Sequence, residues 1–417
     1  MLPSALDSSM PERVSLAVES TRPREVAAPA RARPRIRAAS GTDVTLQDWQ
    51  QSVELLRVAF NGGPNWFEIP VEPRDHLVWK LVDYPGPTRA YFSEDHQMLV
   101  GFVATLGRDW LVRGQPRVAT DMVDAALHPR VQGRVLVESF RYLRREINAW
   151  NGADFSFSFA SHPALIRNRG FQGKHDLGQQ LETFIKPLDL LRFVRGERTR
   201  SGTGESRTRI QIEHERRRRR RPALVRLLAW EGRLVAHRLR RRAPSPDIGE
   251  PFAIGAIERF DDRVDGLFER AATEFDLIQA RRADFLNWRY ADPRAGHFTI
   301  RVAEAEGELL GYAVTRTTQA TADLADLLVL PGREDVACAL LRDSISVARE
   351  AGSSAIRSWM TRGHPYEGLL GALGFVRVRT STRPVLHANP RTDPEELAFL
   401  ESPGVRVHLM LGDSDHV

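Results

Sequence analysis

Apolar residues along the chain follow two different periods, which change from one segment to the next. Some apolar positions repeat every third or fourth residue, as on one face of a helix, and others form the short runs typical of strands. Helices that alternate with strands in this way predict an α/β fold. The expected helices are Leu46–Phe60, Asp75–Leu81, a helix ending near Trp150 and Ala164–Arg169, and the expected strands are Ala90–Phe92, Met98–Leu106, Phe155–Ala160 and Gln180–Lys186.

The segment 119–135 contains both patterns within a few residues. It begins as a short apolar run, breaks at Pro129, and passes Gly133 into a stretch with helical periodicity. A strand that turns on glycine into a helix points backbone N–H groups at one place, where the helix N-terminus adds a partial positive charge. The segment therefore predicts a phosphate-binding turn.

Much of this pattern occurs twice in the chain. Four short motifs recur in the same order, at offsets between 202 and 210 residues, which predicts two copies of one α/β domain. The matched motifs are Asp75-His-Leu-Val-Trp79-Lys80 with Asp284-Phe-Leu-Asn-Trp288-Arg289, Leu99-Val-Gly-Phe102 with Leu309-Leu-Gly-Tyr312, Asp121-Met-Val-Asp124 with Asp323-Leu-Ala-Asp326, and His162-Pro163 with His364-Pro365.

The two copies define a domain organisation. We expect a disordered tail at 1–41, a first domain at 42–186, an Arg-rich linker at 187–252 and a second domain at 253–417. The tail is rich in Ala, Arg and Pro and has no hydrophobic period. Within the linker, 216–242 has leucines at helical spacing among many arginines, which predicts a basic amphipathic helix.

Positive charge is concentrated in that predicted helix. Residues 216–242 hold twelve arginines and one glutamate, a local charge of +11 in a chain of net charge +6, so the rest of the chain is acidic. A solvated linker is the first interpretation, and peripheral membrane contact through 216–242 is the second. Nucleic-acid binding ranks last, because Trp230 is the one aromatic residue available for stacking.

Composition limits the class of protein further. The chain has 417 residues, 42% of them hydrophobic, which suits a globular protein of two or three domains. The single cysteine, Cys338, excludes a disulfide framework, and no apolar run approaches the ~20 residues that a membrane-spanning helix needs. Because the N-terminus also lacks an apolar signal-peptide core, we expect a cytoplasmic protein.

The order of the elements resembles the GNAT acyltransferase superfamily. Arg130-Val-Gln132-Gly133-Arg134-Val135 stands where that superfamily has its pyrophosphate-binding signature, and Arg169-Gly170-Phe171 is similar to its late Gly-Phe element. The resemblance covers 42–186 and, more weakly, 256–380. Tandem GNAT proteins include mycothiol synthase-like and Fem-type enzymes, and the chain matches neither subgroup. The resemblance implies two tandem GNAT-like domains, each a mixed central sheet flanked by helices.

The resemblance also implies a co-substrate and a place for it. Acetyl-CoA or another acyl-CoA is expected in the first copy, with no metal. The first copy departs from the signature at Val135, where Gly or Ala is usual. The second copy departs further, because Leu330-Pro-Gly-Arg-Glu-Asp335 adds two acids that would repel a diphosphate, so it is expected to shape the substrate site or the structure. The expected cofactor-binding residues are Ala125, Ala126, Leu127, Arg130, Gln132, Gly133, Arg134 and Val135.

Acyl transfer to an amine needs a base for the amine, an oxyanion site and an acid for the leaving thiolate. By the resemblance the base is a carboxylate on the central strand. This selects Asp121, with Asp124 facing the other way along the strand. A structural role for both carboxylates is the alternative, and their recurrence in the second copy fits it. The superfamily's thiolate acid is often a tyrosine, and none stands at 155–171, so Ser158, Ser161 and His162 are the available groups. Backbone N–H groups near Ala126 and Leu127 would form the oxyanion site.

The leading hypothesis is an acyltransferase that moves an acyl group, acetyl by preference, from acyl-CoA to a small-molecule or peptide amine in the cleft between the copies. A non-catalytic GNAT-fold scaffold and a Fem-type aminoacyl-tRNA-dependent transferase are the alternatives. Three other features have structural interpretations. Trp79 and Trp288 are expected to anchor the core or an interdomain contact, the His-Pro pair at His364 to form a turn, and Val405–Leu411 to form a closing strand of the second sheet.

Overall fold

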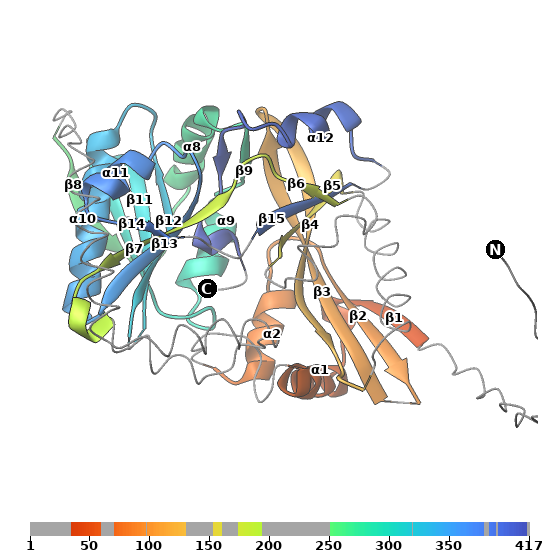
Figure 1. Cartoon of the computed structure of the whole chain (residues 1–417). Coiled ribbons are helices and arrows are strands. Elements are labelled where there is room, and N and C mark those ends of the chain that lie inside the picture. The colour runs from red at the N-terminus through yellow and green to blue at the C-terminus, as the bar shows by residue number, and fades with distance from the viewer. Residues whose placement is uncertain are drawn as a thin grey trace, which may run out of the picture. The chain divides into compact units, whose positions relative to one another are not determined.

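The described part of the chain is built on two mixed β-sheets with helices on their faces (Figure 1). The computed structural model describes residues 35–59, 71–96, 98–130, 153–160, 174–193, 251–318, 320–378, 383–388 and 391–414. These residues all lie in one compact unit, Pro34–Val417. The expected α/β class is confirmed.

The first sheet is organised around a long and almost fully buried strand. Its order is β1 (Arg35–Ser40), β2 (Thr88–Asp95), β3 (Met98–Val112), β4 (Gln115–Leu127), β5 (Phe155–Ala160), β15 (Arg383–Ala388) and β6 (Lys174–Asp176), with β9 (Leu277–Gln279) and β16 (Val407–His408) at its side. The central strand β3 pairs with β2, β4 and β9, and its apolar sequence is buried as expected for a strand covered on both faces. β4 and β5 are parallel, whereas β2, β3 and β4 are antiparallel neighbours.

The second sheet repeats the central arrangement of the first. Its order is β14 (Val376–Val378), β7 (Leu181–Pro187), β13 (Ala355–Thr361), β12 (Ala322–Val329), β11 (Glu308–Thr317), β10 (Phe298–Ala305) and β8 (Ala253–Ile257). β10, β11 and β12 are antiparallel, and β12 is parallel to β13. Each sheet thus has three antiparallel strands followed by a parallel one, so the two halves of the chain share one strand plan.

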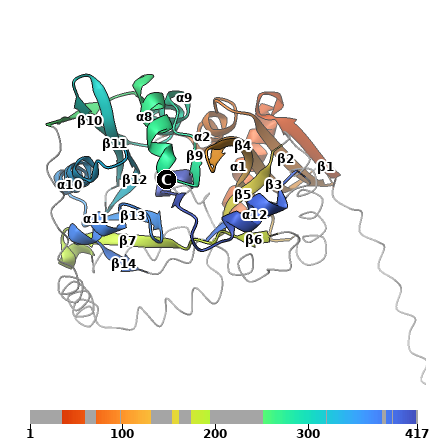
Figure 2. The same ribbon diagram turned by 90° about the horizontal axis from the view of Figure 1, so that it is seen from above.

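Each sheet also contains a strand from the other half of the sequence. β7, which the sequence analysis puts at the end of the first copy, pairs with β13 and β14 of the second sheet. β15 lies in the second copy by sequence and pairs with β5 and β6 of the first sheet. Figure 1 labels both strands, with β7 beside β13 and β14 and with β15 beside β5, and Figure 2 shows β7 beside β14 from above. The exchange means that neither sheet is built from one half alone.

Helices cover the sheets with their apolar faces. The helices are α1 (Leu46–Ala59), α2 (Pro73–Leu81), α8 (Arg263–Ala271), α9 (Ala283–Leu286), α10 (Glu334–Glu350), α11 (Glu367–Ala372) and α12 (Pro394–Leu400), with single turns η1 (Gly41–Asp43), η3 (Ala272–Glu274), η4 (Asn287–Ala291) and η5 (Leu411–Asp413). α1 packs on β3 and β4, and α10 packs on β10, β11 and β12. In α10 the buried residues Val336, Leu340 and Leu341 recur at helical spacing, which gives this helix one face toward the core.

Two tryptophans join the halves inside a shared core. The rings of Trp79 and Trp288 stack with centroids 4.7 Å apart and planes 11° apart. Each indole N–H donates to the other residue's backbone carbonyl oxygen, in both cases at 3.1 Å. The reciprocal bonds satisfy two polar groups that burial would otherwise leave unpaired. The recurring tryptophans are therefore core anchors and also the contact between the two copies.

Several predicted elements are found where the sequence analysis expects them. The helices Leu46–Phe60 and Asp75–Leu81 correspond to α1 and α2, and the strand Phe155–Ala160 corresponds to β5. The predicted strand pair is found as the longer β2 and β3. The helices expected up to Trp150 and at Ala164–Arg169 lie outside the described residues.

Two expectations are corrected by the structure. The expected disordered tail is wrong for 35–41, because Arg35–Ser40 form β1 and pair with β2. The guanidinium of Arg37 lies 4.4 Å from the ring centre of Phe92 and also contacts Asp48 and Glu94, which holds this polar strand at the sheet edge.

The expected closing strand Val405–Leu411 is also different. Only Val407–His408 are a strand, and they pair with β9 at the side of the first sheet, not with the second sheet. The chain then turns into η5, where the buried Arg289 and Arg108 donate to the carbonyl oxygens of Gly412 and Asp413.

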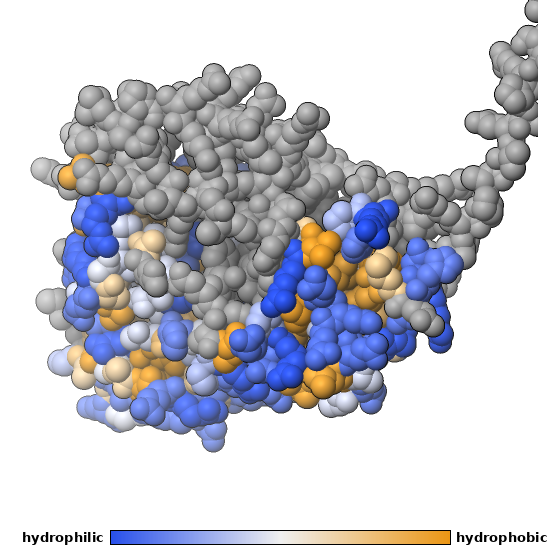
Figure 3. Space-filling view, turned by 90° about the horizontal axis from the view of Figure 1, so that it is seen from below, coloured by the Kyte–Doolittle hydropathy of each residue, from blue (hydrophilic) through white to orange (hydrophobic). Residues whose placement is uncertain are grey.

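The surface of the described residues has both hydrophilic and hydrophobic areas. Figure 3 shows hydrophilic areas with smaller hydrophobic ones between them on the face seen from below. Exposed large apolar side chains include Leu46 and Val58 of α1, and single residues of this kind are usual on protein surfaces. Among the helices that the structure describes, none is long and apolar enough to cross a membrane.

Candidate active site

The parallel strands β4 and β5 pair only over their first residues. The last Cα partners are Asp121 and Phe157, although β4 continues to Leu127 and β5 to Ala160. We call the ends that no longer pair with each other, 122–127 of β4 and 158–160 of β5, the first splay; on their other sides these ends still pair with β3 and β15. Backbone groups that no longer bond to the neighbouring strand can bond to another chain or a ligand, so the first splay is the place to look for a site.

A β-bulge interrupts β4 at the first splay. Phe102 of β3 faces Ala126 and Ala104 faces Val123, so two residues of β4 oppose one residue of β3. One of the two, Asp124, has a left-handed backbone with φ of 52°. Aspartate tolerates this conformation better than most residues, and a bulge re-aims side chains on its strand. The bulge breaks the simple alternation that the sequence analysis assumed for Asp121 and Asp124.

Asp124 is held by a buried lysine. The ammonium of Lys80, at the end of α2, donates to a carboxylate oxygen of Asp124 at 2.9 Å. Both side chains are at least nine-tenths buried, at 7% and 5% exposure. Buried ions need partners, and removal of one of them typically costs about 3–5 kcal/mol. The pair fixes α2 to the bulge of β4.

Asp121 is held by a buried arginine. Arg108 of β3 lies 2.8 Å from a carboxylate oxygen of Asp121, and both side chains are buried. The same guanidinium also donates to the side-chain oxygen of Gln279 at 2.9 Å. A fixed cation beside a carboxylate stabilises the charged form, and the carboxylate is then a weaker base. This geometry favours the structural alternative for Asp121.

The second sheet has the same splay and bulge. β12 and β13 stop pairing after Leu324 and Ser358, and the register of β11 and β12 shifts next to Asp326. We call 325–329 of β12 and 359–361 of β13 the second splay. Asp326 stands at its bulge as Asp124 stands at the first, which agrees with their match in the repeated sequence.

The second splay is occupied by the chain's own C-terminal segment, defined here as 405–414. The η5 turn of this segment contacts both β12 and β13. The hydroxyl of Thr361, the last residue of β13, donates to the carbonyl of Val407 at 2.5 Å. A Cβ atom on Gly412 would come within 1.9 Å of the Tyr290 hydroxyl and 3.0 Å of the Ala325 carbonyl oxygen. The fit is close enough that only glycine suits this position.

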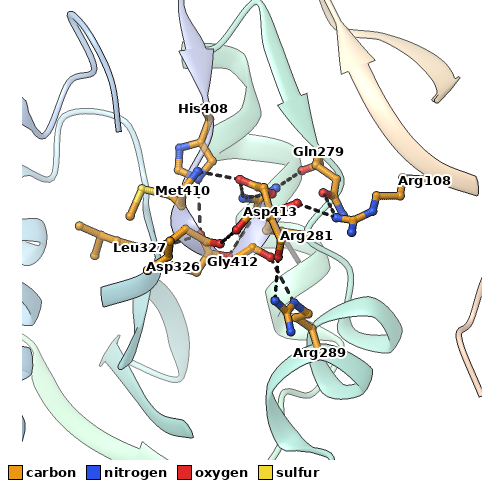
Figure 4. Close-up of polar contacts among 12 residues, drawn as sticks. Arg108, Gln279, Arg281, Arg289, Asp326, Leu327, His408, Met410, Gly412 and Asp413 are labelled. Carbon is orange, nitrogen blue, oxygen red and sulfur yellow. Dashed lines mark hydrogen bonds and ion pairs between the residues drawn. The ribbon is translucent and has the colours of Figure 1, made fainter. Parts of the chain in front are cut away.

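Three buried arginines hold the C-terminal segment (Figure 4). Arg281 contacts the Asp413 carboxylate at 2.8 Å, and Arg108 donates to the Asp413 carbonyl at 3.1 Å. Arg289 donates to the carbonyls of Gly412 and Ser414 at 3.2 and 3.0 Å. These bonds satisfy carbonyl groups that lie away from water, and they come from both halves of the chain.

Asp326 lies at the centre of this polar cluster. Arg281 approaches one carboxylate oxygen at 3.3 Å, and the Tyr312 hydroxyl donates to the same oxygen at 3.0 Å. Burial alone would raise the pKa of the Asp326 carboxyl, but Arg281 holds that pKa below its usual range. Burial raises the pKa of Tyr312 well above its usual value. Asp326 is therefore a charged, hydrogen-bonded anchor for the segment.

Two buried histidines extend the cluster in one direction. The backbone N–H of Tyr366 donates to Nδ1 of His364, so the ring proton of His364 is assigned to Nε2, which lies 2.9 Å from Nδ1 of His408. The proton of His408 is then on Nε2, 3.6 Å from an oxygen of Asp326. Burial lowers the pKa of both histidines, most strongly for His364. Both rings are neutral at pH 7. His364, where the sequence predicts a turn, therefore belongs to a buried chain of polar side chains that leads through His408 to Asp326.

The N-terminus of α10 differs from a phosphate site, as its sequence suggests. Glu334 and Asp335 lie in its first turn, and Arg333 pairs with Asp335 at 2.9 and 3.0 Å. The helix dipole is thus already complemented by carboxylates of the chain itself. A diphosphate at this position would meet like charge.

The remaining predicted site residues are described only in part. Ala125 is exposed at the bulge, Ala126 is buried, and Leu127 ends β4. Arg130 is exposed, and its backbone N–H donates to Nδ1 of His128 at 3.2 Å. Gln132, Gly133, Arg134, Val135 and Ser161 lie outside the described residues.

The sequence analysis missed most residues of the polar cluster around the C-terminal segment. These are Arg108, Gln279, Arg281, His408 and Asp413. Two signals were available, because Arg108 interrupts an apolar strand and Gly412-Asp413-Ser414 follows an apolar run. Neither signal identifies its partner across the molecule, since Arg108 lies 171 positions from Gln279 and 305 from Asp413, and Arg281 lies 132 from Asp413.

Comparison with solved structures identifies the class of fold. A probable N-acyltransferase from Enterococcus faecalis superposes with a TM-score of 0.52 and 11% identity, over 86% of this chain and 72% of that chain. The N-myristoyltransferase of Saccharomyces cerevisiae, with bound myristoyl-CoA and inhibitors, has a TM-score of 0.52 and 13% identity, over 90% of this chain and 86% of that chain.

The chain therefore has the fold of GNAT-type N-acyltransferases, and the resemblance expected from the sequence is confirmed for the fold. No protein-family model matches the sequence, and no curated protein matches it either. Within the described ranges no group of three or more His, Cys, Asp or Glu residues could hold a metal ion.

Proposed function

We propose that the protein transfers an acyl group from acyl-CoA to an amine, and that the first copy holds the donor. One observation carries this assignment. The two halves have equivalent splays, and the second is occupied by the C-terminal segment, whereas the first leads into the predicted phosphate-binding turn of the segment 119–135. The shared fold with N-acyltransferases supports the reaction class.

The chemistry of the donor suits a splay of this kind. The arm of CoA between its nucleotide and its sulfur is an extended chain with two amide groups. In the second splay the occupant is also a chain of amides, and its carbonyls accept hydrogen bonds from buried cations. A donor in the first splay would place its diphosphate toward the predicted phosphate-binding turn, where helix N–H groups favour an anion.

The reaction needs few groups from the protein. The amine nitrogen attacks the thioester carbon, a C–N bond forms and the C–S bond breaks. The amine loses a proton and the thiolate gains one. The developing oxyanion would be stabilised by backbone N–H groups near the bulge, where Ala126 and Leu127 follow Asp124.

The catalytic roles of Asp121, Asp124 and Ser161 remain part of the proposal. Asp121 beside Arg108, and Asp124 beside Lys80, are better placed to position the strand than to accept a proton directly. Either carboxylate would act as a base through an intervening water. Ser161 follows β5 in the sequence, next to the first splay.

The acceptor is proposed to be a small-molecule or peptide amine that enters between the two copies. Acetyl is the proposed acyl group on the basis of the sequence resemblance. A neighbour of the same fold is bound to myristoyl-CoA, so the length of the acyl chain has to be tested together with binding.

Thermal unfolding with different donors tests the proposed function. A ligand that binds the folded protein at 100 times its Kd adds about 2.7 kcal/mol and raises Tm. We expect a shift with acetyl-CoA or with a longer acyl-CoA, and CoA release when a matching amine is added. No shift with acetyl-, octanoyl- or myristoyl-CoA at millimolar concentration would contradict the proposal and favour the scaffold alternative.

Matched charge changes in the two copies test the placement. Gly133→Glu puts a negative charge into the predicted turn of the first copy and should abolish the shift in Tm. Pro331→Glu adds the same charge at an exposed turn residue of the second copy and should leave the shift intact. Equal loss in both variants would contradict the assignment of the donor to the first copy.

A further inference from the structure

The reciprocal tryptophan pair is followed in each copy by a cation. Lys80 follows Trp79, and Arg289 follows Trp288. Because the two rings stack on each other with reciprocal hydrogen bonds, the residues that follow them are in equivalent positions in the two halves. Each cation points to the splay of its own copy.

Arg289 shows what such a cation does when its splay is occupied. Its guanidinium donates to the carbonyl oxygens of Gly412 and Ser414, two amide carbonyls of the segment in the second splay. Arg289 is buried, at 4% exposure. Its hydrogen bonds therefore replace those that water would make to both partners.

Lys80 occupies the equivalent place at the first splay. Its ammonium bonds to Asp124 at the bulge of β4 and is 5% exposed. An ammonium has three N–H bonds, and among the described residues Asp124 is its one hydrogen-bond partner. Two buried donors thus remain for an acceptor, and buried donors rarely go without one.

We infer that Lys80 binds the acyl donor, by donating a hydrogen bond to an amide carbonyl oxygen of its CoA arm. The contact corresponds to that of Arg289 with the carbonyls of Gly412 and Ser414 in the second splay. Asp124 positions the ammonium and leaves it two free donors. This inference rests on the proposed function, because it concerns the same splay.

The choice of an amide over the thioester carbonyl follows from the same comparison. The carbonyls that Arg289 binds are amide oxygens in the middle of a chain, not a terminal group. The contact therefore concerns the part of the donor that free CoA and acyl-CoA have in common. Lys80 contributes to binding whether or not an acyl group is attached.

Two variants separate this contact from the buried ion pair. Lys80→Met alone leaves Asp124 buried beside an apolar group and is expected to destabilise the fold. Asp124→Asn keeps Lys80 and an amide oxygen to accept its hydrogen bond, but it removes the counter-ion and therefore also costs stability. The double variant Lys80→Met/Asp124→Asn removes both charges and leaves no unpaired ion. The comparison of these two variants isolates the ammonium, and thermal unfolding without ligand verifies that both are folded.

The measurement is the Kd of free CoA and of acetyl-CoA by calorimetry. We expect the double variant to bind both ligands at least about tenfold more weakly than Asp124→Asn. Equal affinity of the two variants, with a wild type that binds, overturns the inference and leaves the proposed function standing. A loss confined to acetyl-CoA overturns the amide assignment. A wild type that binds neither ligand overturns the proposed function itself.

Discussion

At the scale of single residues, the two copies use equivalent positions for different partners. Arg289 binds carbonyls of the chain itself, and Lys80 binds Asp124 and retains donors for a ligand. Asp326 is fully enclosed by Arg281 and Tyr312. Equivalent positions in the two halves thus carry charge, but the groups that they contact differ.

Buried histidines make the stability of the fold depend on pH. Burial lowers the pKa of His364 and His408, and it lowers the pKa of His76 to about 3. Below pH 6.5 the unfolded chain therefore binds more protons than the folded chain, and stability falls as the pH falls. For His76 the loss continues down to about pH 3.

Each buried histidine should contribute a slope of about 1.4 kcal/mol per pH unit below pH 6.5. Urea unfolding between pH 7.5 and 5.5 measures the slope. His364→Gln should reduce it by about one histidine's share, whereas His96→Gln, at a side chain 88% exposed, should not change it. A stability that stays constant from pH 7.5 to 5.5 would contradict the neutral, buried state of these rings.

At the scale of elements, the splay is the feature that both halves share and use differently. In each half a parallel strand pair stops early beside a bulge. In the second half the C-terminal segment 405–414 takes the place between the strands. Among the described residues, this leaves the first splay as the proposed place for a ligand.

The close fit of the C-terminal segment predicts a large effect of one methyl group. Gly412→Ala would bring a Cβ atom within 1.9 Å of the Tyr290 hydroxyl, so we expect a loss of roughly 1–3 kcal/mol of stability. Gly404→Ala, where a Cβ atom meets nothing within 4 Å, should change stability by less than about 0.5 kcal/mol. Urea unfolding of both variants measures the difference. Equal stabilities would mean that the segment is not packed in the second splay.

The elements that could be predicted are those whose sequence pattern is complete within the element itself. Helices α1 and α2 and strand β5 have complete periodic patterns, and the sequence indicates them within a few residues. The recurrence of Trp79 at Trp288 predicts the repeat. The exchange of β7 and β15 has no local signal, because a strand has the same pattern in either sheet.

The candidate site was predictable to a smaller extent. The resemblance to GNAT acyltransferases selected Asp121 and Asp124, but their cations, Arg108 and Lys80, could not be assigned from spacing. The bulge at Asp124 was also unforeseen, since one extra residue in β4 leaves no trace in composition.

At the scale of the whole described unit, the two halves depend on each other. Each sheet includes a strand from the other half, the tryptophans stack across the contact, and Arg108 of the first half holds Asp413 of the second. The C-terminal segment is thus fixed by both halves. The proposed division of roles follows, with one half holding the donor and the other half completing the site.

The stoichiometry of donor binding tests this division most directly. Calorimetric titration of the full chain with acetyl-CoA, or with the acyl-CoA that gives the largest shift in Tm, counts the sites per chain. We predict one site, which Gly133→Glu removes and Pro331→Glu retains, because the second splay is occupied by 405–414. Two sites per chain, or one site that survives Gly133→Glu, would contradict the account.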